Sequence, residues 1–227
     1  MDIILVAGLW LRNSIWDDVA VALERQGHRP IPITLPGVDD ASPAVTLADQ
    51  VAAVVAAVDD ADRPMVVGHS AACTLVWMVA DQRPEMVHSV VLIGGFPAGD
   101  GDTYADFFEP IDGLMGFPGW EPFEGPDSAD LDEVARREFV ASAVSVPSGV
   151  SKGIVHLTDA RRFDVPILAV CPEYTPDQAR GWIEAGEVPE LTNATRVTFA
   201  DIDSGHWPMV TRPVELAQIL ADAATAS

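Results

Sequence analysis

The chain has 227 residues, of which 48% are hydrophobic, and this suits one globular domain with a sizeable core. Its 35 acidic and 13 basic residues give a formal net charge of −22, which repels phosphate backbones and anionic lipid. We therefore exclude nucleic acid as a partner and interpret the acidity as a solvated surface.

Membrane and secretion signals are not found in the sequence. No apolar run approaches the ~20 residues that a membrane-spanning helix needs, so no membrane partner is expected. The start of the chain lacks a basic region and a cleavage site, which predicts a cytoplasmic protein. Cys73 and Cys171 are too few for a disulfide framework, and we interpret them as small buried residues.

Short apolar runs alternate with longer amphipathic stretches, a pattern typical of βα repeats and a parallel sheet. The runs are nearly continuous in Val, Ile and Leu, as expected of strands covered on both faces. Thr46 and Thr175 are expected helix N-caps, and Gly27 is an expected helix C-terminal residue. The expected elements in chain order are strand 3–7, helix 14–26, strand 31–34, helix 47–60, strand 65–67, helix 71–82, strands 89–93 and 167–171, helix 176–185, strand 196–202 and helix 214–223.

One segment, 96–163, breaks this alternation. It is rich in Gly, Pro and aromatic residues, and only 131–141 has a clear helical pattern. A long irregular stretch inside a compact domain is more often a functional cap than a linker. The sequence thus predicts an α/β fold: a mostly parallel sheet of about six strands, helices on both faces, and a small irregular cap. We expect a single domain over 1–227, with the cap inserted at roughly 96–163.

A candidate nucleophile lies where the strand 65–67 meets the next helix. The sequence Gly68-His69-Ser70-Ala71-Ala72 is close to G-x-S-x-G, in which a tight turn holds the serine hydroxyl above the sheet. Ala72 replaces the final glycine. A helix N-cap serine is the alternative interpretation, but the strand–turn–helix context favours Ser70 as a nucleophile.

A serine needs a histidine base to become nucleophilic. His206 follows the last strand and precedes the last helix, in the segment Asp203-Ser204-Gly205-His206-Trp207-Pro208. This position, at the carboxyl edge of the sheet, fits a base. The other four histidines fit less well, because they follow a helix, precede a strand, lie in the cap or adjoin the nucleophile.

The acid of such a triad follows the strand before the histidine strand. The loop after 167–171 contains Glu173, which is the preferred candidate. Asp177 is a second candidate, although the first turn of a helix explains an acidic residue there equally well. Asp102, after the preceding strand, is a third.

Two backbone N–H groups are expected to stabilise a tetrahedral oxyanion. Ala71 follows the nucleophile, and Leu9 follows Gly8 in the turn after the first strand. Aromatic residues of the loops and the cap are candidates for an apolar substrate pocket, although each could instead pack the cap onto the core. These residues are Trp10, Phe96, Phe107, Phe108, Trp120, Phe123 and Trp207.

Together, Leu-Val-Ala-Gly-Leu-Trp at 5–10, the Ser70 turn, the Glu173 loop and Gly205-His206-Trp207-Pro208 resemble the α/β-hydrolase fold superfamily. More narrowly, the chain is similar to small members related to plant-type methyl ester esterases and hydroxynitrile lyases. The resemblance implies a serine esterase. The aromatic residues of the loops and the cap favour a small, uncharged, largely apolar ester, thioester or lactone as its substrate. The sequence departs from the superfamily at Ala7 and Ala72 and in the acid loop, where Tyr174 stands near the expected aspartate.

The sequence leaves two other functions open. One is a cofactor-free lyase of the hydroxynitrile lyase type, in which Ser70 and His206 act as acid and base without an acyl-enzyme. The other is a non-catalytic receptor for a small molecule. Nucleotide-binding glycine motifs and histidine pairs at metal-ligand spacing do not occur, so neither a cofactor nor a metal is expected. The oligomeric state is open.

Overall fold

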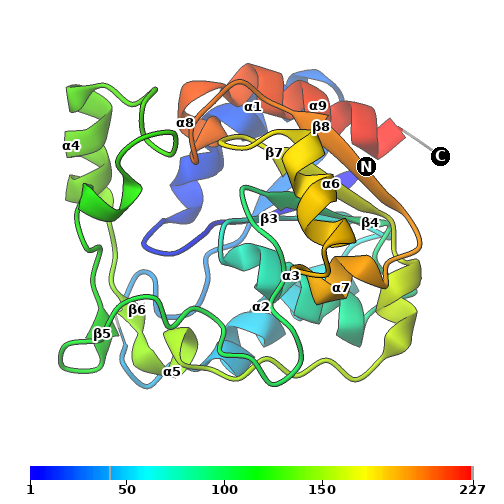
Figure 1. Cartoon of the computed structure of the whole chain (residues 1–227), viewed down its shortest axis with the longest axis horizontal. Helices are drawn as coiled ribbons and strands as arrows, with labels where there is room; N and C mark the ends of the chain where they lie inside the picture. The colour runs from blue at the N-terminus through cyan, green and yellow to red at the C-terminus, as the bar shows by residue number, and fades with distance from the viewer. Residues whose placement is uncertain (41, 226–227) are drawn as a thin grey trace.

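The central sheet has six strands, all parallel, with helices on both faces (Figure 1). The computed structural model describes residues 1–40 and 42–225. The predicted fold class is confirmed. In sheet order the strands are β2 (Arg29–Pro32), β1 (Asp2–Val6), β3 (Met65–His69), β4 (Ser89–Ile93), β7 (Ile167–Cys171) and β8 (Val197–Asp201).

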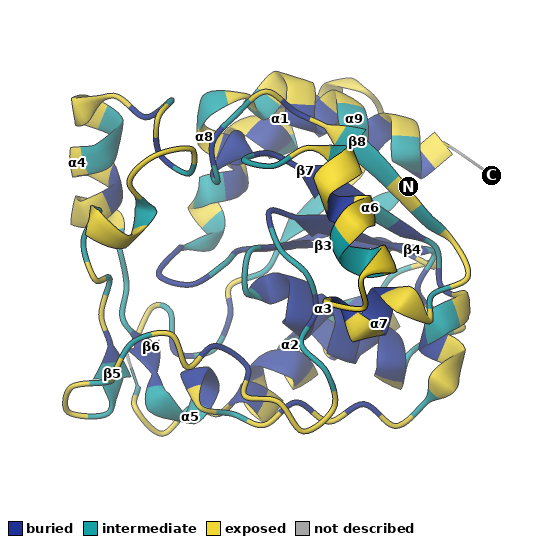
Figure 2. Cartoon of the chain, in the orientation of Figure 1, coloured by how far each residue is buried: buried dark blue, intermediate teal, exposed yellow. Residues whose placement is uncertain are grey.

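The helices pack as two layers, one against each face of the sheet. One face carries α1 (Asp17–Arg25) and α9 (Pro213–Thr225), which contact each other. The opposite face carries α2 (Leu47–Asp59) and α3 (Ala72–Gln82), and Figure 2 shows α3 almost wholly buried. The remaining helices outside the β4–β7 connection are η1 (Asn13–Trp16), α6 (Pro176–Glu184), α7 (Pro189–Thr192) and α8 (Pro208–Thr211).

Strand β1 shows why the apolar runs are continuous. Ile4 and Val6 belong to the hydrophobic cluster on the α2 and α3 face, whereas Ile3 and Leu5 belong to the cluster on the α1 and α9 face. All four side chains are 0% exposed. Successive side chains of a strand point to opposite faces, so a strand with helices on both sides needs an apolar residue at every position.

Helix ends follow the predicted signals. Thr46 and Thr175 both form capping boxes, with Asp49 and Gln178 as their partners. Gly27 has a φ of 82°, the left-handed conformation that ends helices. No helix among the described residues is long and apolar enough to cross a bilayer.

Two predicted strands differ from the observed strands by two residues. Strand β2 spans Arg29–Pro32 and not the predicted 31–34. Its first residues, Arg29 and Pro30, pair with β1 at the sheet edge but carry no apolar signal. The predicted strand 65–67 continues to His69, since β3 stays paired with β4 as far as His69 and Ile93.

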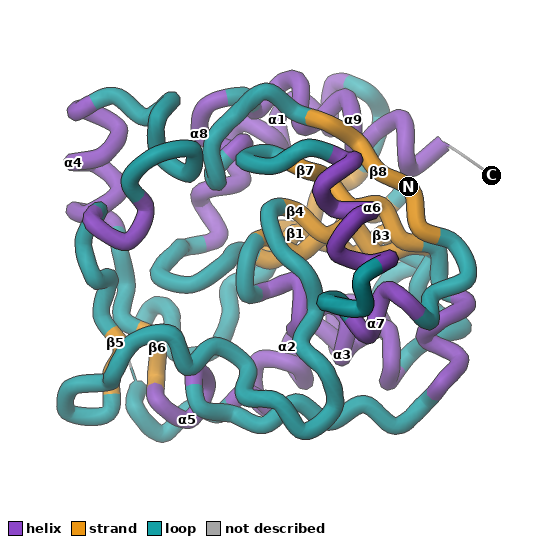
Figure 3. The backbone as a smooth tube through the Cα atoms, in the orientation of Figure 1, coloured by secondary structure: helices purple, strands orange, loops and turns teal. Residues whose placement is uncertain are grey.

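The connection between β4 and β7 contains the predicted cap and is mostly loop (Figure 3). The predicted helix 131–141 is observed as α4, which starts at Glu133 because the Asp132 side chain caps it. Regular structure here is limited to β5 (Leu114–Met115), η2 (Glu121–Phe123), α4 (Glu133–Ser142), β6 (Val146–Pro147), α5 (Ser148–Ser151) and η3 (Ala160–Asp164). β5 and β6 form a separate antiparallel pair, which the sequence did not predict.

Candidate active site

Ser70 occupies a strained turn between β3 and α3. Its φ is 56°, a left-handed conformation that is uncommon for a residue with a side chain. Its N–H donates to the carbonyl of Ile93 at 2.8 Å, which anchors the turn to β4. Gly68 is required because a Cβ there would lie 2.5 Å from the Ala72 carbonyl oxygen. The alternative of a simple N-cap serine does not fit, since no side-chain cap begins α3.

His206 lies between Ser70 and Glu173. Its Nε2 is 2.9 Å from Ser70 Oγ, and its Nδ1 is 2.8 Å from Glu173 Oε1. The ionised carboxylate only accepts, so Nδ1–H donates to Glu173 and the Nε2 lone pair faces the serine O–H. The side chains of His206 and Glu173 are 14% and 15% exposed. Three loops at the carboxyl ends of β3, β7 and β8 supply these groups.

The other two acids lie elsewhere. Asp177, in the first turn of α6, is 93% exposed and pairs with Arg180 at 2.7 Å. Asp102 is exposed and accepts a hydrogen bond from the Gly99 N–H at 2.8 Å. Among the three predicted acids, only Glu173 is within hydrogen-bond distance of His206.

The turn after β1 lies against the Ser70 turn. A Cβ on Gly8 would come within 2.8 Å of His69 Nδ1 and 3.1 Å of Ser70 Cβ, so only glycine permits this approach. Within the described part of the chain, the N–H groups of Leu9 and Ala71 have no protein acceptor. Both amides are therefore free to donate to a developing oxyanion.

The sequence did not reveal that His69 supports the base. His69 is buried, and its Nε2–H donates to the backbone carbonyl of His206 at 2.8 Å. Burial, and then the nearby His206, lower the pKa of His69 to about 3, so it is neutral. The only signal in the sequence was its place beside Ser70.

The β4–β7 connection holds the His206 loop from the other side. Asp127 accepts the His206 N–H through its carbonyl at 2.7 Å, and Asp130 Oδ2 accepts the Gly205 N–H at 2.8 Å. Burial, and then the Glu173 carboxylate, raise the pKa of the Asp127 carboxyl. The residues in these contacts are about 75 positions apart in the sequence, so no local sequence pattern predicts them.

The predicted substrate-binding aromatics fall into two groups. Trp10 contacts Phe108 and Phe123, and Trp120 contacts Trp207, which is 3% exposed. Phe96 lies instead with Tyr174 and Trp182 beside the Glu173 loop. Phe107 is 63% exposed. Aromatic side chains thus join the Leu9 turn, the cap and the His206 loop.

Metal ligands are not grouped in this region. Within residues 1–40 and 42–225, no group of three His, Cys, Asp or Glu side chains is arranged to hold a metal ion. The side chains that meet at His206 are a serine hydroxyl and a carboxylate.

Comparisons with solved structures agree with this architecture. An extracellular alpha/beta-hydrolase from a Paenibacillus species, described as sharing structural and functional homology with tobacco salicylic acid binding protein 2, is similar with a TM-score of 0.78 at 18% identity, covering 98% of each chain. A pyrethroid hydrolase from Sphingobium faniae JZ-2 has a TM-score of 0.72 at 22% identity, covering 100% of this chain and 98% of that one. A methylesterase from Arabidopsis has a TM-score of 0.71 at 14% identity, covering 99% of each chain. Because one of these proteins is extracellular, the cytoplasmic location stays a prediction.

Sequence comparison gives the family. No curated protein sequence matches the chain at a significant level. The model of the alpha/beta hydrolase family, in contrast, matches residues 3–219, nearly the whole chain. The order of Ser70, Glu173 and His206 along the sequence is the order that this fold requires. The chain belongs to the alpha/beta hydrolase family.

Proposed function

We propose that this protein is a serine hydrolase that cleaves a small, uncharged, apolar carboxylic ester, thioester or lactone. One observation carries the proposal: Ser70 Oγ, His206 and Glu173 form a continuous hydrogen-bonded chain of 2.9 and 2.8 Å at a strained turn. A serine that only forms a structural hydrogen bond rarely needs a left-handed backbone conformation. A nucleophilic serine held above the sheet by a tight turn does need it.

The reaction has two half-steps. Ser70 Oγ attacks the acyl carbon while His206 Nε2 accepts its proton, and the same proton then goes to the leaving alcohol. Water repeats the sequence on the acyl-enzyme and releases the carboxylic acid. Glu173 keeps Nδ1 protonated and stabilises the imidazolium that forms at each step.

The oxyanion of each tetrahedral intermediate is stabilised by backbone groups. The amides of Leu9 and Ala71 are the proposed donors, since both lack a protein acceptor in the described structure. Only backbone atoms take part, so the side chain of Leu9 is free to serve packing.

The aromatic groups support an apolar substrate. Trp10, Phe108, Trp120 and Trp207 lie in one connected cluster, and Phe96 lies near Glu173. Such side chains offer large apolar contact area and few groups that bind a charge. The formal charge of −22 also disfavours anionic substrates.

The decisive experiment compares Ser70→Ala with wild type on p-nitrophenyl esters of increasing acyl length. We expect kcat to fall by about 10³-fold or more, with unchanged far-ultraviolet circular dichroism. Ser14→Ala is the matched control, since Ser14 is exposed on η1. A folded Ser70→Ala protein that keeps most of its activity would refute the mechanism.

Two further readouts separate the other candidate functions. A fluorophosphonate probe should label Ser70 in a hydrolase, whereas a receptor would stay unlabelled. Turnover in H₂¹⁸O should place one heavy oxygen in the acid product. A lyase that uses Ser70 and His206 only for proton transfer would release product without that oxygen.

A further inference from the structure

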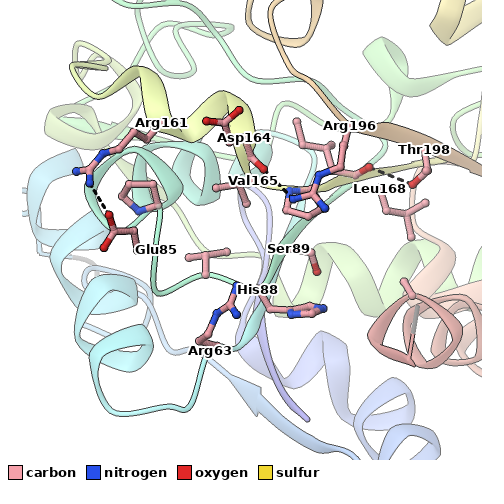
Figure 4. A pocket seen from close by; sticks show the side chains of 15 residues that line it. Arg63, Glu85, His88, Ser89, Arg161, Asp164, Val165, Leu168, Arg196 and Thr198 are labelled. Carbon is pink, nitrogen blue, oxygen red and sulfur yellow. Dashed lines mark hydrogen bonds and ion pairs between the residues drawn. The ribbon is translucent and has the colours of Figure 1, made fainter. Parts of the chain in front are cut away.

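A cleft of about 500 Å³ is shown in Figure 4. It lies at the end of the sheet opposite Ser70. Its lining includes Ser89 and Ile167, which begin β4 and β7, and Thr198 near the start of β8. All six strands are parallel and Ser70 follows the carboxyl end of β3, so the strand length of about 16 Å separates the two sites. Its volume is in the range of small-molecule sites.

The charge of this cleft is the reverse of that of the whole chain. Three of the 13 basic residues line it, Arg63, Arg161 and Arg196, but only two of the 35 acidic residues, Glu85 and Asp164. The lining therefore carries a net charge of +1 in a chain of −22. A positive cleft on so acidic a surface focuses the local field and attracts anions.

The three arginines are not equally available. Arg161 is occupied, because it pairs with Glu85 at 2.7 Å and with Asp159 at 2.5 Å. Arg196 makes one hydrogen bond, to the Asp164 carbonyl at 3.0 Å, and keeps its other donors. Arg63 makes no ion pair with any described residue. Guanidinium donors thus face the cleft without carboxylate partners.

Two uncharged polar groups lie near these arginines. Ser89 is 9% exposed, and its Oγ has no hydrogen-bond partner among the described residues. A buried hydroxyl without a partner costs stability, so such a group calls for an explanation. His88 lies beside it (Figure 4), and burial and then the charges of Arg63 and Arg196 lower its pKa.

Part of the cleft lining is apolar. Val87, Val165 and Ile167 are at most 2% exposed, whereas Leu168 and Ala223 are half-buried and keep apolar surface that a ligand can cover. A ligand that fits both parts needs an anionic group and a short apolar body. The rim acids and the net charge of +1 favour a monoanion over a doubly charged phosphate ester.

We propose that this cleft binds a small amphipathic carboxylate, whose head contacts Arg63, Arg196 and Ser89 while its apolar body lies on the half-buried Leu168 and Ala223. Charge-assisted hydrogen bonds from guanidinium groups hold the carboxylate. Ser89 Oγ–H donates to a carboxylate oxygen and so gains the partner that it lacks. The assignment is independent of the chemistry at Ser70.

Isothermal titration calorimetry with sodium octanoate tests the proposal on the full-length protein. We expect saturable binding that is at least about tenfold tighter than that of 1-octanol, which lacks the charge, and of inorganic phosphate, which lacks the apolar body. Octyl phosphate should bind no more tightly than octanoate. Equal binding of octanol and octanoate, or tighter binding of octyl phosphate, would overturn the assignment.

The variant Arg63→Gln/Arg196→Gln locates the binding. It should weaken octanoate binding by about tenfold or more, whereas the matched control Arg161→Gln should stay within about threefold, since Glu85 and Asp159 already occupy that side chain. Both variants should keep the wild-type turnover of esters. Unchanged octanoate affinity in the double variant would place the binding elsewhere, the Ser70 region included.

Nuclear magnetic resonance of the His88 ring measures the pKa of His88 with and without octanoate. This pKa would not change if the arginines served only to stabilise the fold. A bound carboxylate offsets the charges of Arg63 and Arg196, so octanoate should raise the pKa of His88 toward its usual value. Ser89→Ala should weaken octanoate binding by a few-fold without unfolding the protein. A His88 titration that octanoate leaves unchanged would contradict the proposal.

Discussion

Glu173 approaches His206 through one carboxylate oxygen and leaves the other, Oε2, buried without a hydrogen-bond partner in the described chain. Among the described residues, the imidazole of His206 is therefore the only side-chain hydrogen-bond partner of this carboxylate. A buried charge with few partners is costly, and its attraction to an imidazolium is correspondingly strong.

Replacing Glu173 by Gln tests this assignment. The amide is a poor partner for an imidazolium and also favours the wrong tautomer, so we expect kcat to fall by about 10²–10⁴-fold. Asp177→Asn is the control, because Asp177 is 93% exposed and pairs with Arg180; its kcat should change by less than about twofold. A larger loss of kcat in the Asp177 variant than in the Glu173 variant would identify Asp177 of α6 as the acid.

His69 gives a prediction about pH. Its pKa is lowered to about 3 in the folded protein, while the unfolded chain titrates near 6.5. The neutral side chain therefore contributes full stability above pH 6.5, and the contribution is lost as the pH falls from 6.5 toward 3. The unfolding free energy should decrease by up to about 1.4 kcal/mol per pH unit in that interval.

Urea denaturation between pH 7 and pH 5 measures this loss. His69→Gln should flatten the profile, because glutamine keeps a donor for the His206 carbonyl but does not titrate. His156→Gln, at an exposed position, should keep the wild-type slope. If the His69 variant also keeps that slope, His69 is not held neutral in the folded state.

At the scale of elements, a buried ionic network joins α3, η3 and α7. Arg162 of η3 contacts Glu190 at 2.9 Å and Asp81 at 3.2 Å, and the three side chains are at most 9% exposed. Trp77 of α3 also donates to Glu190 at 2.8 Å. The network fastens the end of the β4–β7 connection to the helices beneath it.

Arg162→Ala should therefore destabilise the protein by about 3–5 kcal/mol, because it leaves two buried carboxylates without a cation. Its neighbour Arg161 is 60% exposed, so Arg161→Ala should cost less than about 1 kcal/mol. Chemical denaturation of both variants gives the comparison. Similar losses in the two would show that burial does not strengthen the Arg162 contacts.

Across the whole molecule, we expect the β4–β7 connection to move relative to the core when a substrate enters. The cavity beside the Gly8–Trp10 turn holds about 20 Å³, which is room for about one water molecule. Trp10 also forms two hydrogen bonds with the β4–β7 connection: its Nε1–H donates to the Met115 carbonyl, and its own carbonyl accepts from the Val144 N–H. Opening of such caps admits substrate, and closing excludes water.

Phe108→Ala and Trp120→Ala test the role of the cap. Each should change kcat/KM unequally, by up to about tenfold, across esters of different acyl length. Thermal stability should fall by less than about 2 kcal/mol, since both side chains are only half-buried. Phe107→Ala, 63% exposed, is the control and should leave the chain-length profile unchanged. Uniform scaling of all rates would make these aromatics structural.

Features that depend on local chemistry could be predicted from the sequence. Continuous apolar runs predicted the parallel strands, Thr46 and Thr175 marked helix starts, and the Gly68–Ser70 turn placed the candidate nucleophile. Each depends on neighbouring residues, through side-chain periodicity or backbone conformation, and so can be read without the fold.

Contacts between groups that are far apart in the sequence became known from the fold. Glu173, in the loop after β7, contacts His206. Asp177 lies in the first turn of α6 and is exposed to solvent. Asp130 reaches Gly205 across 75 positions, and Arg63 and Arg196 converge on one cleft. Such pairings depend on how helices and loops pack around the sheet, and no periodicity within a short stretch specifies the distance between residues so far apart.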